Sequence, residues 1–230
     1  MWHIVAKATP QLVVKGLEVT IPLALVSFAI GLIIATFTAL ILISKKRGWF
    51  RIIKAIFGFY VWLFRSTPML VQLFITYFGL PYLTIPGILP NGIKMSSATA
   101  ALIVFSLNEG AYCSETIRSS VLSIPEGQWE AAYSLGMTKR QVLKKVIFPQ
   151  ALRVAIPPLS NSFISTVKGT SLVYTISVVD MFGLAQQIAA QNYQPMIMYT
   201  LTAALYAVAC TILTILQKYL EKTSSKYVAR

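Results

Sequence analysis

Long apolar runs separated by short clusters of charge are the feature that most constrains this chain. A helix needs about 20 apolar residues to cross a bilayer, and each run is of that order. With 56% hydrophobic and 12% charged residues, the apolar side chains exceed what one soluble core would bury. The sequence therefore predicts an all-α integral membrane protein, one domain over residues 1–230, with about five transmembrane helices at 17–43, 56–80, 96–117, 154–176 and 196–217.

The basic residues indicate the orientation of these spans. Lysine and arginine concentrate in cytoplasmic loops. Three regions hold most of them: Lys45, Lys46, Arg47, Arg51 and Lys54; Arg118, Lys139, Arg140, Lys144, Lys145 and Arg153; Lys218, Lys222, Lys226 and Arg230. We expect the N-terminus outside, the C-terminus in the cytoplasm and a multi-pass location in the cell membrane. The net charge of +13 flanks the spans, so it indicates contact with the lipid bilayer and no nucleic-acid partner.

Other residue classes exclude several functions. Cys113 and Cys210 lie in apolar runs without a CxxC pattern, and His3 stands alone near the N-terminus, so we expect neither a metal site nor a disulfide framework. The first apolar run is too long for a signal peptide, so it should remain as a span. No set of nucleophile and base indicates an enzyme.

The second span is interrupted at Arg65-Ser66-Thr67-Pro68. Proline donates no backbone hydrogen bond, and Ser or Thr caps a new helix that we expect to start at Pro68. Such a break at membrane depth either lines a pathway or is a kink with a packing role. Pro68 and Arg65 are therefore gating or structural candidates, and Arg65 would pair with an acid, bind a lipid phosphate or reach the cytoplasmic interface.

A loop of about thirty residues, 121–153, separates the third and fourth spans and is too ordered for a simple connector. Residues 126–135 favour a short helix after Pro125, with Gly136 as the residue that ends it. A second helix should follow, with Thr138 and Gln141 as a capping box. Farther on, residues 180–194 should form an outer loop or an amphipathic helix at the membrane interface.

The short helix and its turn predict a compact apolar knob for a groove on a partner, made by Ala131, Ala132, Leu135 and Met137. Here the chain resembles the EAA loop of ABC import permeases. That pattern is Glu-Ala-Ala, three residues, Gly, nine residues, an aliphatic residue, one residue, and an apolar residue before Pro. Its positions in this chain are Glu130, Ala131, Ala132, Gly136, Val146, Phe148 and Pro149.

Further segments resemble the polar-amino-acid branch of these permeases, the family of histidine, glutamine, arginine and cystine permeases. They are Phe64 to Leu73, Gly110-Ala111-Tyr112 with Glu115 and Arg118, and Pro149 to Asn161. The chain departs from the pattern at Lys168-Gly169, where relatives usually carry Asp after the Lys, so a Lys-Asp pairing stays open there.

The resemblance implies a type I ABC importer permease fold and a division of labour. Two permease subunits, as a homodimer or heterodimer, line a path, two ATPase subunits bind the EAA loops, and an extracytoplasmic binding protein delivers a polar amino acid. The ATPase-coupling residues are then Glu130, Ala131, Ala132, Leu135, Gly136 and Met137. The chain lacks a GxxxxGK[ST] motif, so it carries no cofactor itself, and ATP with Mg²⁺ belongs to the ATPase partner.

Polar residues within the spans are the candidates for substrate contact. Asn108 and Glu109 come first, because a carboxylate in a membrane is costly unless it faces a cavity or a partner. Gln72, Asn161 and Ser162 would add contacts, or would only form hydrogen bonds between helices. The cargo stays open between cystine, glutamine and basic amino acids.

Glu115 and Arg118 are three residues apart near the cytoplasmic end of the third span, a spacing that favours an ion pair with a structural or gating role. The alternative function is a secondary amino acid transporter driven by an ion gradient, with Glu109 as the coupling group. Such a transporter would work without an ATPase.

Overall fold

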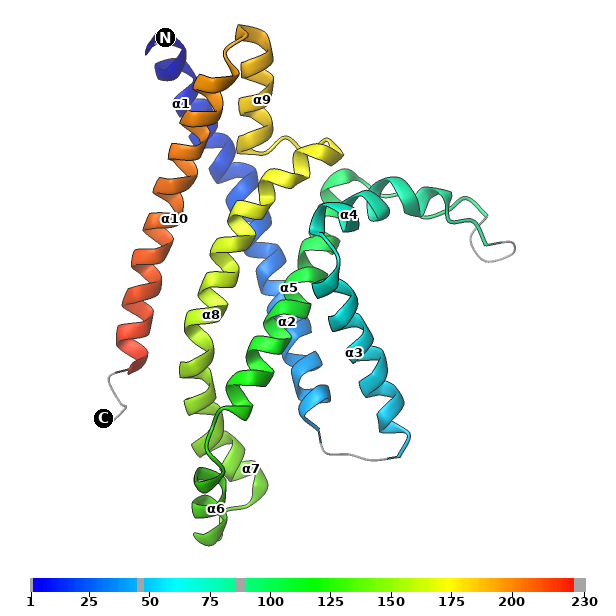
Figure 1. Cartoon of the computed structure of the whole chain (residues 1–230), viewed down its shortest axis with the longest axis vertical. Coiled ribbons are helices and arrows are strands. Elements are labelled where there is room, and N and C mark those ends of the chain that lie inside the picture. Colours follow the sequence, from blue (N-terminus) through cyan, green and yellow to red (C-terminus); the bar gives the residue numbers. More distant parts are fainter. Residues whose placement is uncertain (1, 45–47, 86–89, 226–230) are drawn as a thin grey trace.

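The computed structural model describes residues 2–44, 48–85 and 90–225, and these residues form helices joined by short connections without a strand. Figure 1 shows long helices running roughly side by side, with two short helices, α6 and α7, at one end. The basic residues at the start of α3, in α7 and near the end of α10 lie toward that half of the molecule. Lys45, Lys46, Arg47, Lys226 and Arg230 lie outside the described residues.

The first helix is longer than the sequence predicted. It comprises α1 (Trp2–Lys15), a π-helical turn η1 (Gly16–Thr20) and α2 (Ile21–Ile43), and continues over 42 residues. Its start is helical because Ala8 and Leu12 are buried against α9 and α10. Farther along, Gly31 allows close approach to α5, since a Cβ there would lie 2.7 Å from Glu109 Cβ.

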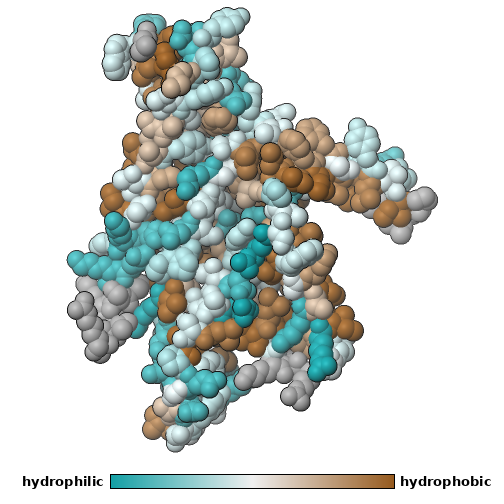
Figure 2. All heavy atoms as spheres, in the orientation of Figure 1, coloured by the Kyte–Doolittle hydropathy of each residue, from teal (hydrophilic) through white to brown (hydrophobic). Residues whose placement is uncertain are grey.

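The break in the second span is confirmed. Helix α3 (Phe50–Ser66) ends before an extended Thr67 and Pro68, and α4 (Met69–Phe74) continues through η2 (Ile75–Gly79) into η3 (Leu80–Tyr82). The expected cap was wrong: the new helix begins at Met69 without a side-chain cap, and the Thr67 hydroxyl instead donates to the Leu63 carbonyl at 2.8 Å and accepts from Gln72 Nε2 at 2.9 Å. The segment from α4 to η3 forms an arm that runs to the side of the bundle (Figure 1), and hydrophobic side chains cover much of its visible face (Figure 2).

Helix α5 (Ser97–Leu122) is capped by Ser96, whose hydroxyl accepts a hydrogen bond from the Thr99 amide, and it extends past the predicted span. Its Ala100, Ala101, Val104 and Phe105 share a buried core with residues of α4 and of η5 (Thr170–Ile176). This core lies where the arm leaves the bundle.

The predicted helix-turn-helix of the loop is confirmed. Helix α6 (Glu126–Ser134) is followed by Leu135 and then by the turn at Gly136, whose φ is +73°. Thr138 and Gln141 form the capping box that starts α7 (Lys139–Gln141). A π-helical segment, η4 (Val142–Ile147), leads into α8 (Phe148–Gly169), so α7, η4, α8 and η5 run as one helix from Lys139 to Ile176. The loop has a core of its own, made by Ile124, Ala132, Val142, Ile147 and Ala151.

Two further helices complete the chain. Helix α9 (Met181–Asn192) forms where a loop or a helix was expected, and its place at the membrane interface stays a prediction. Helix α10 (Pro195–Ser225) then runs along α8.

Two described helices, residues 2–43 and 195–222, are long and apolar enough to cross a membrane, or three if the bent pair of 139–176 and 181–192 forms one span. Helix α3 has 17 residues, fewer than the roughly 20 of a full span. Helix α5 carries Asn108 and Glu109 in its middle. The count of five spans therefore stays a prediction.

Candidate functional site

The break between α3 and α4 is closed by two amide side chains. Gln72 Nε2 donates to the Phe64 carbonyl at 3.0 Å and to the Thr67 carbonyl at 3.1 Å. Asn108 Nδ2, from α5, donates to Gln72 Oε1 at 3.0 Å and lies 3.4 Å from the Phe64 carbonyl. These amides satisfy carbonyl groups that the end of α3 leaves free. Both side chains are nearly inaccessible, and Asn108 is 5% exposed.

The side chain of Glu109 contacts α8, whereas that of Asn108 contacts α4. Its carboxylate accepts hydrogen bonds from the Thr166 hydroxyl at 2.6 Å and the Ser162 hydroxyl at 3.0 Å, both on α8, while Cys113 Sγ lies 3.6 Å away. Glu109 is 5% exposed. The acid therefore joins α5 to α8, and its oxygens are occupied by donors of this chain.

The five candidates for substrate contact do not line one cavity. Gln72 pairs with Asn108, Glu109 pairs with Ser162, and Asn161 lies exposed on α8 apart from both pairs. The interhelical hydrogen bonds that the sequence left as an alternative are present in both pairs.

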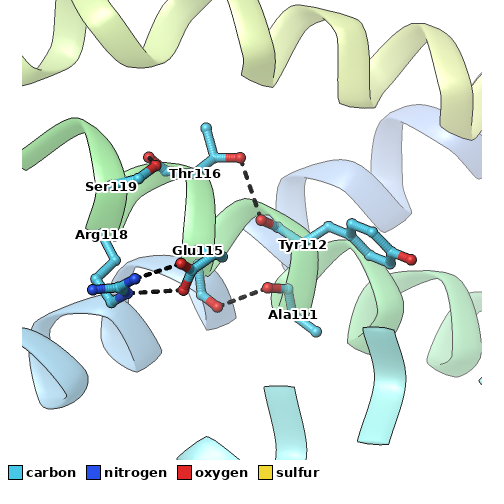
Figure 3. Close-up of polar contacts among 7 residues, drawn as sticks. Ala111, Tyr112, Glu115, Thr116, Arg118 and Ser119 are labelled. Carbon is cyan, nitrogen blue, oxygen red and sulfur yellow. Dashed lines mark hydrogen bonds and ion pairs between the residues drawn. The ribbon is translucent and has the colours of Figure 1, made fainter. Parts of the chain in front are cut away.

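The ion pair between Glu115 and Arg118 is present. Arg118 Nε lies 2.8 Å and Nη2 2.5 Å from the two carboxylate oxygens of Glu115, and Figure 3 shows the guanidinium facing the carboxylate along α5. Both side chains are about one-third exposed, so this pair contributes little to stability, about 0 to 1 kcal/mol.

An open cavity of about 500 Å³ lies beside this ion pair, between α2, α3 and α5. Arg65 stands at its wall with its guanidinium carbon 5.6 Å from the centre of the Tyr112 ring, and the Tyr112 hydroxyl lies 3.4 Å from the Arg65 carbonyl. The lining residues are Leu42, Gly58, Val61, Trp62, Arg65, Ser66, Tyr112 and Glu115. Pro68 follows directly after this wall, at the helix break.

The loop exposes only part of the predicted knob. Leu135 is 82% exposed, and Glu130, Ala131 and Gly136 also face outward. The expected exposure of Ala132 was wrong, because this side chain is 4% exposed and lies in the core of the loop, where Met137 also packs. A helical spacing of one residue turns neighbouring alanines by about 100°, which separates Ala131 from Ala132.

Sequence reasoning missed Thr166 and a buried site at Asp180. The Asp180 carboxylate accepts a hydrogen bond from the Gly183 amide at 2.8 Å and from the Tyr206 hydroxyl at 3.1 Å. An Asp just before a helix is typical of an N-cap, so the contact with the Gly183 amide was predictable from the sequence. The contact with Tyr206 on α10 was not. Lys168 lies exposed and forms no ion pair with any residue that the structure describes.

Both cysteines are free, and no cluster of three or more potential metal-ligating residues occurs within residues 2–44, 48–85 and 90–225.

Comparisons with known proteins agree with this architecture. The family profile of the binding-protein-dependent transport system inner membrane component matches residues 29–226. The L-cystine transport system permease protein TcyB of Bacillus subtilis is 42% identical over 230 residues, covering 100% of this chain and 93% of the relative. The putative glutamine transport system permease protein GlnP of Rickettsia bellii is 31% identical, covering 96% and 98%.

Solved structures give the same result for the fold. A crystal structure of an amino acid ABC transporter with histidines superimposes with a TM-score of 0.84 at 32% identity, covering 95% of this chain and 96% of that one. The inward-facing MetNI methionine ABC transporter, at 19% identity and a TM-score of 0.74, supports the fold alone. The resemblance to ABC import permeases is confirmed, and the chain belongs to the family of inner membrane components of binding-protein-dependent transport systems.

Proposed function

We propose that this chain is the permease subunit of an ATP-driven ABC importer for polar amino acids. The observation that carries the proposal is the folded loop around α6, which has its own core, an exposed Leu135 and a continuous helical connection to α8. Family membership over residues 29–226 supports this reading. Cystine is the first substrate to test, because the 42% identical relative is a cystine permease, with glutamine and basic amino acids next.

The topology and partners follow as parts of the same proposal. Five spans with an outer N-terminus place α6 in the cytoplasm, where two ATPase subunits would bind the exposed surface of Glu130, Ala131, Leu135 and Gly136. Ala132 and Met137 would support this surface from the core of the loop, where their side chains pack. ATP and Mg²⁺ bind the ATPase subunits, this chain holds no cofactor, a second permease subunit completes the path, and an extracytoplasmic binding protein delivers the amino acid.

The experiment is uptake by the assembled transporter in proteoliposomes with its binding protein outside and ATP inside. We expect labelled L-cystine, L-glutamine or L-arginine to accumulate only with ATP present, and a protonophore to leave uptake unchanged. Uptake by the lone chain that survives ATP removal and collapses with the ion gradient would establish the secondary transporter instead, with Glu109 as its coupling group.

A further inference from the structure

The cavity between α2, α3 and α5 is lined by two side chains of opposite charge, Arg65 and Glu115. Arg65 forms no close ion pair with any of the described residues: its guanidinium lies against the Tyr112 ring, and Glu115 across the cavity attracts it only at longer range. The guanidinium is exposed and has no described carboxylate at ion-pair distance, so it can bind an anionic group from elsewhere. Across the same cavity, the Glu115 carboxylate is held in place by Arg118.

This arrangement fits the head group of an amino acid. Arginine binds carboxylates through two parallel hydrogen bonds, which suits the α-carboxylate of the ligand. The Glu115 carboxylate and the faces of Tyr112 and Trp62 suit its ammonium group. The cavity volume of about 500 Å³ falls within the range of small-molecule sites, about 300 to 1,000 Å³.

The remaining walls leave room for a side chain. Gly58 and Leu42 are apolar lining residues, and a Cβ placed on Gly58 would meet nothing within 4 Å. The polar candidates Asn108 and Glu109 are engaged with other helices and nearly inaccessible, so they offer no competing site.

We infer that the cavity between Arg65 and Glu115 binds the zwitterionic head of the amino acid during its passage, with Arg65 on the carboxylate and Glu115 on the ammonium group. The inference rests on the proposed function and names the place where the cargo is held. The same chemistry would attract a lipid phosphate to Arg65, and the test distinguishes the two sources.

The test is equilibrium binding to the complete transporter in nanodiscs, without the binding protein. Labelled L-cystine, L-glutamine and L-arginine are compared with their decarboxylated analogues cystamine, 4-aminobutanamide and agmatine. For Arg65→Gln we expect affinity for the amino acid to fall by about tenfold to a hundredfold, as for a lost charge-assisted hydrogen bond, and affinity for the amine analogue to change less than twofold. Lys54→Gln, which removes another positive charge from α3, is the matched control and should change neither.

A second pair of variants does not depend on the charge. Gly58→Leu has space in the fold and fills the cavity, so we expect amino acid binding to fall by at least about tenfold. Gly127→Leu lies on α6, also has open space at its Cβ, and should bind as the wild type does. These variants decide the question if Arg65→Gln does not assemble.

Several results would overturn the inference. They are unchanged binding in Arg65→Gln or Gly58→Leu, an equal loss for amino acid and amine analogue, or an effect of Arg65→Gln that appears only in nanodiscs with anionic lipid. The last result would assign Arg65 to a lipid phosphate. ATP-driven uptake by the wild type alongside any of these would leave the proposed function standing, whereas its absence would remove both.

Discussion

The loop around α6 and the polar contacts inside the helical bundle are built in opposite ways. The loop is stabilised by neighbours in sequence: its core spans Ile124 to Ala151, and its caps join residues three apart. The contacts in the bundle join residues far apart, such as Asn108 with Gln72 and Glu109 with Thr166. A local unit tolerates exposure at one face, whereas a bundle contact in an apolar surrounding leaves buried polar groups without a partner on the other helix when one side chain changes.

The largest loss of stability should follow when the acid that joins α5 to α8 is removed, because this contact lies inside the bundle. Glu109→Ala leaves the Ser162 hydroxyl without its acceptor, leaves the Thr166 hydroxyl only the Ser162 carbonyl, and opens a gap beside Gly31, so we expect the free energy of unfolding to fall by about 2 to 4 kcal/mol. Chemical unfolding in detergent micelles measures it. Asn161→Ala on the exposed part of α8 should stay within about 0.5 kcal/mol, and equal effects of the two variants would contradict the interhelical role.

The helix break gives a smaller effect. Gln72→Leu removes the donor from the Phe64 and Thr67 carbonyl groups, and we expect a loss of about 1 to 3 kcal/mol in the same unfolding experiment. Gln11→Leu, at an exposed position of α1, is the control. A stable Gln72→Leu protein would mean that water already satisfies these carbonyl groups.

Glycine substitutions in and near the turn after α6 distinguish the cost of backbone strain from the cost of side-chain packing. Gly136 has a φ of +73° and open space around its Cβ, so Gly136→Ala should cost about 1 to 2 kcal/mol through the backbone alone. Gly127 has the same open space but lies within α6, where Gly127→Ala should gain about 0.5 to 1 kcal/mol. Hydrogen exchange of the loop in the purified protein compares them, and effects of the same sign would refute the assignment.

A change at Leu135 should have the smallest effect on stability and still reduce transport clearly. Leu135→Ser changes a side chain that is 82% exposed, so we expect unfolding to shift by less than about 0.5 kcal/mol. If Leu135 anchors the ATPase, ATP-driven uptake and co-purification of the ATPase should fall by about tenfold. Normal uptake in this variant would remove Leu135 from the coupling surface.

The same contrast explains what was predictable from the sequence. The helix at residues 126–134, the turn at Gly136 and the capping box at Thr138 were all readable, because each depends on residues within one or two turns. The break at Pro68 was readable for the same reason. The exposure of Ala132 was misjudged because it depends on Ile147 and Ala151, which pack against it only in the folded loop.

The partners of Asn108 and Glu109 were beyond sequence reasoning. The residues themselves stood out as polar groups in an apolar run. Their hydrogen-bond partners lie 36 and 57 residues away, and only the packing of α5 against α4 and α8 brings them together. The helical start of the chain was missed similarly, since Ala8 and Leu12 are buried by the distant α9 and α10.

The unbroken helix from Lys139 to Ile176 has a mechanical consequence. At about 1.5 Å per residue it is roughly 55 Å long, and no irregular connection separates the loop from the bundle, although Pro157 and Pro158 lie within it. Thr166 lies in the second half of this helix and donates a hydrogen bond to Glu109, so a tilt of the helix at the loop would pull on α5 through this contact. A displacement of the loop would therefore reach the middle of the bundle along this helix, less whatever bending Pro157 and Pro158 absorb.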